Sequence, residues 1–123
     1  MTTTDTFSMT NTVVMYRPTG PEELALVAQN DWRRWPPRLP EQPIFYPVTN
    51  EDYAVEIARD WNVPQSGAGF VTRFEVRAQF MARYETHLVG AARHEEWWIP
   101  AEDLEALNDH IVGRIELIRS FLA

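Results

Sequence analysis

The run from His94 to Pro100 (HEEWWIP) contains the side chains that are best suited to chemistry. Because side chains alternate between the two faces of a strand, a strand here would place His94, Glu96 and Trp98 on one face. Burying a carboxylate among aromatic rings carries a large desolvation penalty. Glu96 is therefore expected either to face solvent or to take part in binding or catalysis. His94 has the right chemistry for proton transfer near neutral pH, and it could equally hold a neighbouring group in place.

Two other dipeptides are suited to ligand binding. Tyr16-Arg17 ends the first predicted strand, and Phe45-Tyr46 lies in the second. An arginine at a strand end presents a planar fork to a phosphate or carboxylate, and an aromatic ring can stack on a base. A carboxylate such as that of Glu96 can hold a sugar hydroxyl and stabilise an oxocarbenium-like centre. The simpler interpretations, a surface arginine and a core tyrosine, remain open at this point.

The composition excludes several kinds of chemistry. The 11 basic residues are all arginine, so no lysine can form a Schiff base. The absence of cysteine excludes thiolate catalysis and thiolate metal ligands. The three histidines show no HExxH spacing, and we expect no metal site. A formal charge of −7 argues against nonspecific binding to duplex nucleic acid, although Arg33, Arg34 and Arg38 form a local basic patch.

Length and hydropathy predict one domain without a membrane segment. No stretch approaches the roughly 20 apolar residues that a spanning helix needs, and the first residues lack a signal-peptide pattern. We therefore expect a cytoplasmic protein with no membrane contact. Residues 1–11 are expected to form a flexible tail and residues 12–123 a single domain, because 123 residues suit one compact unit.

Short elements of both kinds are expected to position these groups. Strands are predicted at residues 12–17, 44–48, 70–76, 86–89 and 94–99, and helices at 21–29, 50–61 and 101–110. Residues 79–83 are predicted to form a helical turn, and residues 114–121 a strand or a helix, the alternation favouring a strand. The mixture shows no repeated strand–helix–strand rhythm, which is typical of the α+β class with mainly antiparallel strands.

Several boundaries follow from individual residues. Pro18 is expected to end the first strand, and Asn50 to cap the helix that follows the second. That helix is predicted to bury one face through Tyr53, Ala54, Ile57 and Trp61. Residues 63–69 are expected to form a flexible loop.

A proline-rich loop precedes the second strand. Residues 31–43 contain four prolines, which exclude a regular helix or strand. Trp32 and Trp35 either pack this loop onto the core or are available to a ligand or partner. Trp97 and Trp98 alternate in a strand, so one is expected in the core and the other in a cleft or interface.

The order of these groups along the chain resembles the ADP-ribosyltransferase family, from about Val13 to Leu117. Those enzymes carry a Gln/Glu-x-Glu followed by three apolar residues and often a proline. The run from His94 to Pro100 is similar, with Glu96 in the place of the catalytic glutamate. The chain also looks like small bacterial proteins that are commonly described as "ADP-ribosylation/crystallin J1".

The resemblance implies an α+β ADP-ribosyltransferase-like fold that uses NAD as its substrate and needs no metal. Glu96 would be catalytic and assisted by His94. The NAD-binding residues would be Arg17, Tyr16, Tyr46 and Phe45. The enzyme would cleave the nicotinamide–ribose bond and transfer ADP-ribose to an acceptor that the resemblance does not identify.

A second hypothesis is an inactive member of the fold that acts as a protein- or ligand-binding module. Two departures favour it: Phe45-Tyr46-Pro47-Val48-Thr49 stands where the family has a Ser-Thr-Ser motif, and the chain is short for the family. The loop from Trp32 to Pro43 would then contact a partner. Geometry separates the two hypotheses, since the enzyme requires Arg17, Tyr46 and Glu96 to converge in one cleft. An unrelated enzyme on a similar scaffold is a third interpretation.

Overall fold

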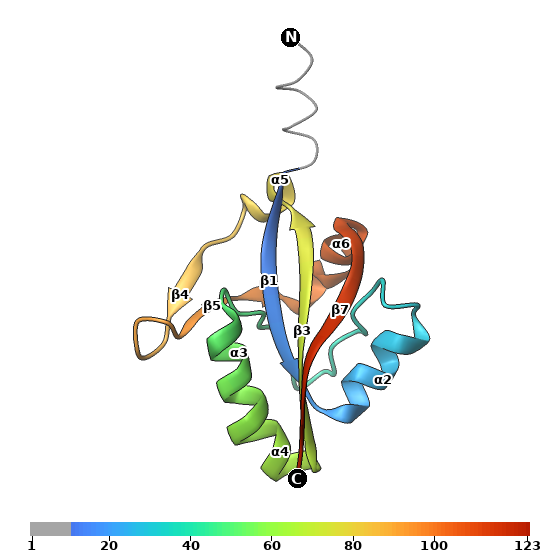
Figure 1. The fold of residues 1–123 in the computed structure, drawn as a ribbon. Helices are drawn as coiled ribbons and strands as arrows, with labels where there is room; N and C mark the ends of the chain where they lie inside the picture. Colours follow the sequence, from blue (N-terminus) through green and yellow to red (C-terminus); the bar gives the residue numbers. More distant parts are fainter. Residues whose placement is uncertain (1–10) are drawn as a thin grey trace.

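Three long antiparallel strands form the centre of the fold in the computed structural model, which describes residues 11–123 (Figure 1). They are β1 (Thr12–Thr19), β3 (Ala68–Arg77) and β7 (Ile111–Leu122), in the order β1-β3-β7. The predicted tail lies outside the described residues except for Asn11, whose carbonyl accepts a hydrogen bond from the N–H of Ala78. The α+β class with mainly antiparallel strands is confirmed.

A single-residue bridge attaches a second group of strands to the free edge of β1. Tyr16 and Val48 exchange backbone hydrogen bonds of 3.0 and 2.7 Å, and Val48 also forms a bridge with Glu96. Glu96 lies in β5 (Glu95–Trp97), which pairs with β4 (Thr86–Leu88) in a hairpin. The register thus places Tyr16, Val48 and Glu96 in one row across the molecule, on the same face.

Two short strands and two helical segments complete the other side of the core. β2 (Ile44–Phe45) pairs with β6 (Ile99–Pro100), which leads into the 3-10 turn η2 (Ala101–Asp103) and helix α6 (Leu104–Asp109). Helix α2 (Pro21–Gln29) follows β1 directly, and its proline and two acidic residues occupy the first turn, where they suit a helix start.

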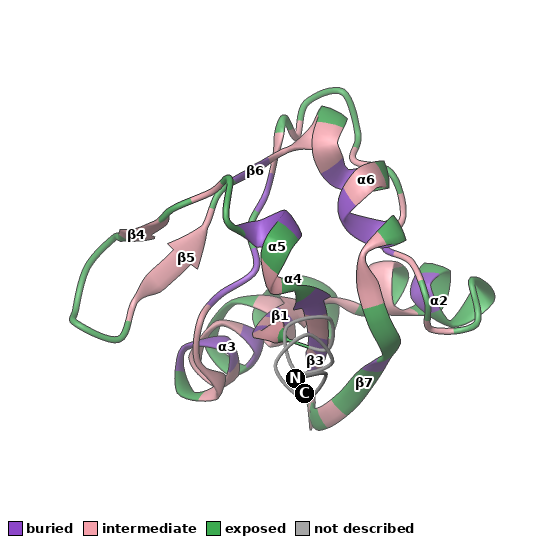
Figure 2. Ribbon diagram, turned by 90° about the horizontal axis from the view of Figure 1, so that it is seen from above, coloured by how far each residue is buried: buried purple, intermediate pink, exposed green. Residues whose placement is uncertain are grey.

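Helices cover both faces of the central sheet. Helix α3 (Glu51–Ile57) lies on one side, and α2 and α6 lie on the other (Figure 2). Val71 and Phe74 in β3 point to opposite faces, and each belongs to a separate buried cluster. The larger cluster contains Met15, Trp35, Phe45 and Leu107, and the smaller contains Val48, Tyr53 and Ala58.

The chain after α3 remains helical for longer than expected. A π-helical turn, η1 (Ala58–Asn62), is followed by α4 (Val63–Ser66), so the prediction of a flexible loop over residues 63–69 is wrong. Gly67 ends the helix with a φ of +82°, a conformation that favours glycine. A further short helix, α5 (Ala78–Met81), overlaps the predicted turn at 79–83.

The extra residue of the π-helical turn moves Trp61 away from the apolar face. Tyr53 and Ala54 are buried as predicted, whereas Trp61 is 63% exposed. A π-helical turn holds one residue more than an α-helical turn and therefore rotates all later side chains. The prediction that Trp61 packs inward is wrong for this reason.

Other predicted elements agree with the structure in part. The helix at 21–29 is confirmed, and so is the cap at Asn50, whose Oδ1 accepts from the N–H of Tyr53 at 2.8 Å. The predicted strand at 94–99 is divided into β5 and β6, and the final segment is a strand. The predicted strand at 44–48 is reduced to β2 and the bridge at Val48.

Strand β1 continues through Pro18 to Thr19, contrary to the prediction that Pro18 ends it. The N–H of Tyr16 points toward Val48, away from β3, and position 18 faces the same way. No strand pairs with β1 there among the described residues, so the missing N–H of proline breaks no hydrogen bond.

None of the helices within residues 11–123 has the length and apolar character needed to cross a membrane.

Candidate functional site

Three of the predicted site residues line one surface cavity of about 760 Å³, here called the Glu96 cavity. Arg17 comes from β1, Tyr46 from the segment between β2 and Val48, and Glu96 from β5. The complete lining is Arg17, Pro18, Arg38, Gln42, Tyr46, Val48, Ile57, Trp61, Asn62, Glu96 and Trp98. The volume lies within the roughly 300–1,000 Å³ that is usual for small-molecule sites.

The carboxylate of Glu96 is held in place by two donors. The hydroxyl of Tyr53 donates to Oε2 at 2.6 Å, and Nε1 of Trp98 donates to Oε1 at 3.0 Å. An ionised carboxylate offers about four acceptor positions, so two remain for a ligand. Glu96 is thus oriented by the protein and still able to accept hydrogen bonds, for example from the vicinal hydroxyls of a sugar.

The hydroxyl that holds Glu96 stays protonated over the physiological pH range. Burial raises the pKa of Tyr53, and the hydrogen bond to Glu96 and the negative charges of Glu96 and Glu56 raise it further. Each of these effects disfavours the phenolate. Tyr53 therefore acts as a permanent hydrogen-bond donor.

His94 lies outside the Glu96 cavity. Its ring stacks on Tyr53 with centroids 4.4 Å apart, and its Nε2 lies 3.3 Å from Oε1 of Glu56. It lines a neighbouring cavity of about 400 Å³ together with Glu56 and Asp60. Tyr53 contacts both His94 and Glu96, which gives His94 the position of a supporting residue.

Arg17 is a buried structural arginine in this fold. Its Nε and Nη2 donate to the two carboxylate oxygens of Glu23 at 2.5 and 2.8 Å. Its Nη1 lies 3.4 Å from the carbonyl oxygen of Tyr46, and its guanidinium lies over the ring of Phe45, 4.6 Å from the centroid. Because both edges of the fork are engaged by Glu23 and Tyr46, Arg17 shapes the cavity wall and holds the Tyr46 segment.

The other predicted binding residues separate into core and cavity. Phe45 is 1% exposed in the larger core cluster, and Tyr16 packs against the smaller one. Neither lines the Glu96 cavity. Tyr46 is 43% exposed at the cavity, so its ring is accessible to a ligand.

Sequence reasoning missed two side chains that line the Glu96 cavity, the exposed Trp61 and the poorly hydrogen-bonded Arg38. Trp61 was expected in the core, but it is exposed and lines the Glu96 cavity, as Trp98 does. Arg38 was noted only as part of a basic patch, but it is largely buried in the cavity wall. Arg38 lies two residues after Pro36 and two before Pro40. Because prolines restrict the conformation of a loop, this spacing could have indicated a side chain with a fixed position.

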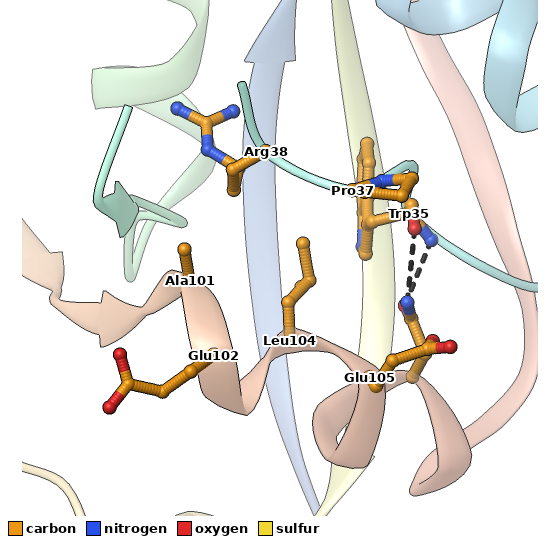
Figure 3. Close-up of a pocket in the computed structure, with 8 residues that line it drawn as sticks. Trp35, Pro37, Arg38, Ala101, Glu102, Leu104 and Glu105 are labelled. Atoms are coloured by element: carbon orange, nitrogen blue, oxygen red, sulfur yellow. Dashed lines mark hydrogen bonds between the residues drawn. The ribbon is translucent and has the colours of Figure 1, made fainter. Parts of the chain in front are cut away.

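The proline-rich loop is packed onto the core. Trp35 is 2% exposed, and the side chain of Asn108 in α6 bonds both its N–H and its carbonyl, at 2.8 and 3.0 Å (Figure 3). A smaller cavity of about 320 Å³ lies between this loop and α6. Of the two interpretations for the loop tryptophans, packing is confirmed for Trp35, which leaves its ring unavailable as a contact surface.

Within residues 11–123 no group of three or more His, Asp or Glu side chains is arranged to hold a metal ion. Comparisons with known protein families, curated proteins and solved structures found no match to this chain. The resemblance to ADP-ribosyltransferases therefore stays a prediction.

Proposed function

We propose that the protein binds a nucleotide of the NAD type in the Glu96 cavity and cleaves its nicotinamide–ribose bond. The observation that carries this proposal is that Tyr46 and Glu96, together with Arg17 as a wall residue, come from three separate segments to one cavity of suitable size. Convergence of these three residues is the condition that the enzyme hypothesis imposes.

The cavity offers the groups that a dinucleotide requires. The rings of Tyr46 and Trp61 are accessible for stacking on the adenine or nicotinamide. The ring of Trp98 also lines the cavity, but it already stacks on His87 with centroids 3.8 Å apart. The two free acceptor positions of Glu96 suit the ribose hydroxyls. Base stacking and a carboxylate–hydroxyl contact would together orient the glycosidic bond.

The proposed reaction needs only charge stabilisation at the sugar. As the bond between ribose and nicotinamide breaks, its electron pair returns to the ring nitrogen and nicotinamide leaves as a neutral molecule. The ribosyl centre becomes positive, and the Glu96 carboxylate stabilises that charge. Water or another acceptor then bonds to the ribose carbon and loses a proton. Transfer to an acceptor and simple hydrolysis share this first step.

A second candidate function is binding without turnover. It is favoured by the placement of His94, which lies behind Tyr53 and does not face the cavity. In this alternative Glu96 recognises the ligand but receives no help from His94 in proton transfer. NAD or a related nucleotide would then be a signal or a structural ligand.

The two candidates are separated by measuring NAD binding and nicotinamide release on the same preparations. We would compare the wild-type protein, Glu96→Gln and Glu41→Gln. Glu41 is an exposed glutamate that does not line the cavity, so its variant is a matched control. Nicotinamide release that is lost only in Glu96→Gln would support the enzyme. Binding without release by the wild-type protein and Glu41→Gln, weakened in Glu96→Gln, would support the binding module, and no binding by the wild-type protein would overturn both.

A further inference from the structure

Arg38 is the least satisfied charged group in the wall of the Glu96 cavity. Its side chain is 12% exposed, and its nearest acidic partner, Oε1 of Glu23, is 3.9 Å from Nη1. Its Nε is buried without a hydrogen-bond partner among the described residues. A guanidinium carries five N–H donors, and buried charges are normally paired and hydrogen-bonded. Arg38 departs from that rule while lying at the edge of a cavity.

Among residues 11–123, Glu23 is the one carboxylate within 4 Å of the Arg38 guanidinium, and it is already engaged. Both oxygens of Glu23 accept hydrogen bonds from Arg17, at 2.5 and 2.8 Å. Two guanidinium groups therefore share one negative charge, and the group of three keeps a net charge of about +1. Burial lowers the pKa of Arg38 from its ordinary value, and the charge of Arg17 lowers it further, which indicates that the charge is poorly compensated.

The arrangement suits an anion that arrives from outside the protein. Arginine forms bidentate hydrogen bonds with phosphate oxygens, and such bonds are about twice as strong as neutral ones. Gln42 also lines the cavity, and its Oε1 accepts from the N–H of Leu39 at 3.3 Å, which directs its amide group to a defined position. A bound phosphate would supply the negative charge that Glu23 cannot share.

We propose that Arg38 is the anion-binding residue of this cavity and that the ligand carries a phosphate or diphosphate group. This inference rests on the proposed function in so far as both place the ligand in the Glu96 cavity. It replaces Arg17 as the phosphate-binding residue, because the fork of Arg17 is occupied by Glu23.

The test is a calorimetric titration of the full chain with inorganic pyrophosphate, ADP and adenosine. Arg38→Gln is compared with Arg33→Gln, which removes an exposed arginine of the same loop that does not line the cavity. We expect pyrophosphate and ADP to bind at least tenfold more weakly to Arg38→Gln than to the wild-type protein. Adenosine has no phosphate, so its affinity should not change, and Arg33→Gln should match the wild-type protein throughout.

Two results would overturn the inference: no binding of pyrophosphate or ADP by the wild-type protein, or equal binding by Arg38→Gln. A fold defect is excluded by circular dichroism and the melting temperature, which should not fall because Arg38 is poorly paired. If Arg38→Gln does not fold, Arg38→Lys decides, since it keeps the charge and loses the bidentate geometry. A severalfold loss of pyrophosphate affinity in Arg38→Lys supports the inference, and unchanged affinity overturns it.

The same titrations separate this inference from the proposed function. Arg38-dependent binding of pyrophosphate without binding of NAD would retain the anion site and overturn the NAD proposal. NAD binding that depends on Tyr46 and Glu96 but is unchanged in Arg38→Gln would retain the NAD proposal and overturn the anion site at Arg38.

Discussion

At the scale of single residues, Glu96 depends on the hydroxyl of Tyr53. Tyr53→Phe removes this donor but fills the same space, so we expect a loss of about 1–3 kcal/mol in the free energy of unfolding. Tyr84→Phe is a matched control, because Tyr84 donates to Asp103 at 2.7 Å outside the cavity. Denaturant unfolding should show similar losses for both variants, and only Tyr53→Phe should reduce NAD binding or turnover. Reduced binding in both variants would contradict the role given to Tyr53.

The carboxylate of Glu23 lies within 4 Å of two guanidinium groups, those of Arg17 and Arg38. Burial would by itself raise its pKa, but the charge and hydrogen bonds of Arg17, together with Arg38, bring the pKa below the ordinary 4.5. The stabilisation from this carboxylate is therefore complete above about pH 4.5 and is lost as the pH falls through the lower folded-state value. We expect the free energy of unfolding to decrease over that acidic range.

Glu23→Gln tests this assignment directly. The variant leaves two largely buried guanidinium groups without a counter-charge, so we expect a loss of about 2 kcal/mol or more at pH 7. The ordinary pKa of a glutamate is 4.5. Below this pH, the unfolding free energy of the variant should vary less with pH than that of the wild-type protein. An unchanged acid slope in urea titrations would show that Glu23 does not contribute to the pH dependence.

The residue-scale predictions from sequence succeeded where side-chain alternation decides position and failed where a turn brings two side chains together. Alternation placed Glu96 beside Trp98, and Nε1 of Trp98 does donate to Glu96. The pairing of Arg17 with Glu23 forms across the turn between β1 and α2. No local pattern shows that this turn brings the two side chains together, so the engagement of Arg17 could not be predicted.

At the scale of elements, one amide connects the proline-rich loop to α6. Asn108→Ala would leave the N–H and carbonyl of Trp35 buried without partners, and we expect a loss of about 2–4 kcal/mol. Asn30→Ala serves as the control, because the Asn30 side chain makes only an exposed bond to a backbone carbonyl. A loss below about 0.5 kcal/mol for Asn108→Ala in denaturant unfolding would show that the loop holds its conformation without α6.

The π-helical turn η1 approaches β3 at Gly69. A Cβ at this position would lie 2.1 Å from the carbonyl oxygen of Ala58, so Gly69→Ala requires a backbone shift. We expect a loss of about 3 kcal/mol or failure to fold. A Cβ at Gly20 would meet Ser66 at an ordinary 3.5 Å, and Gly20→Ala should lose less than about 1 kcal/mol. Equal melting temperatures for the two variants would contradict the close packing of η1 on β3.

Element types were easier to predict than element ends. Helix α2 follows from its proline and acidic start, and its bounds are confirmed. The irregular loop follows from its prolines. The continuation of the helix beyond residue 61, through residues 62–66, was missed, because the run of residues 63–69 is typical of a loop and a π-helical turn has no strong local signature. That one feature also explains the wrong placement of Trp61.

At the scale of the whole molecule, the hairpin of β4 and β5 is connected more weakly than the central sheet. It is joined to β1 through the bridge at Val48, whereas β3 is paired along its length on both sides. We expect backbone amides in β4 to exchange with solvent deuterium about 100-fold faster than those in the middle of β3. Equal protection by mass spectrometry would indicate that the two parts open as one cooperative unit.

The positions of the tryptophans should make the intrinsic fluorescence sensitive to ligand binding. The two exposed indoles, Trp61 and Trp98, both line the Glu96 cavity, whereas Trp35 is buried in the core. An indole in water emits at longer wavelength than an indole in an apolar core, and a base stacked on it quenches the emission. Ligand binding should therefore remove the long-wavelength part of the intrinsic fluorescence first, which provides an optical titration without any label.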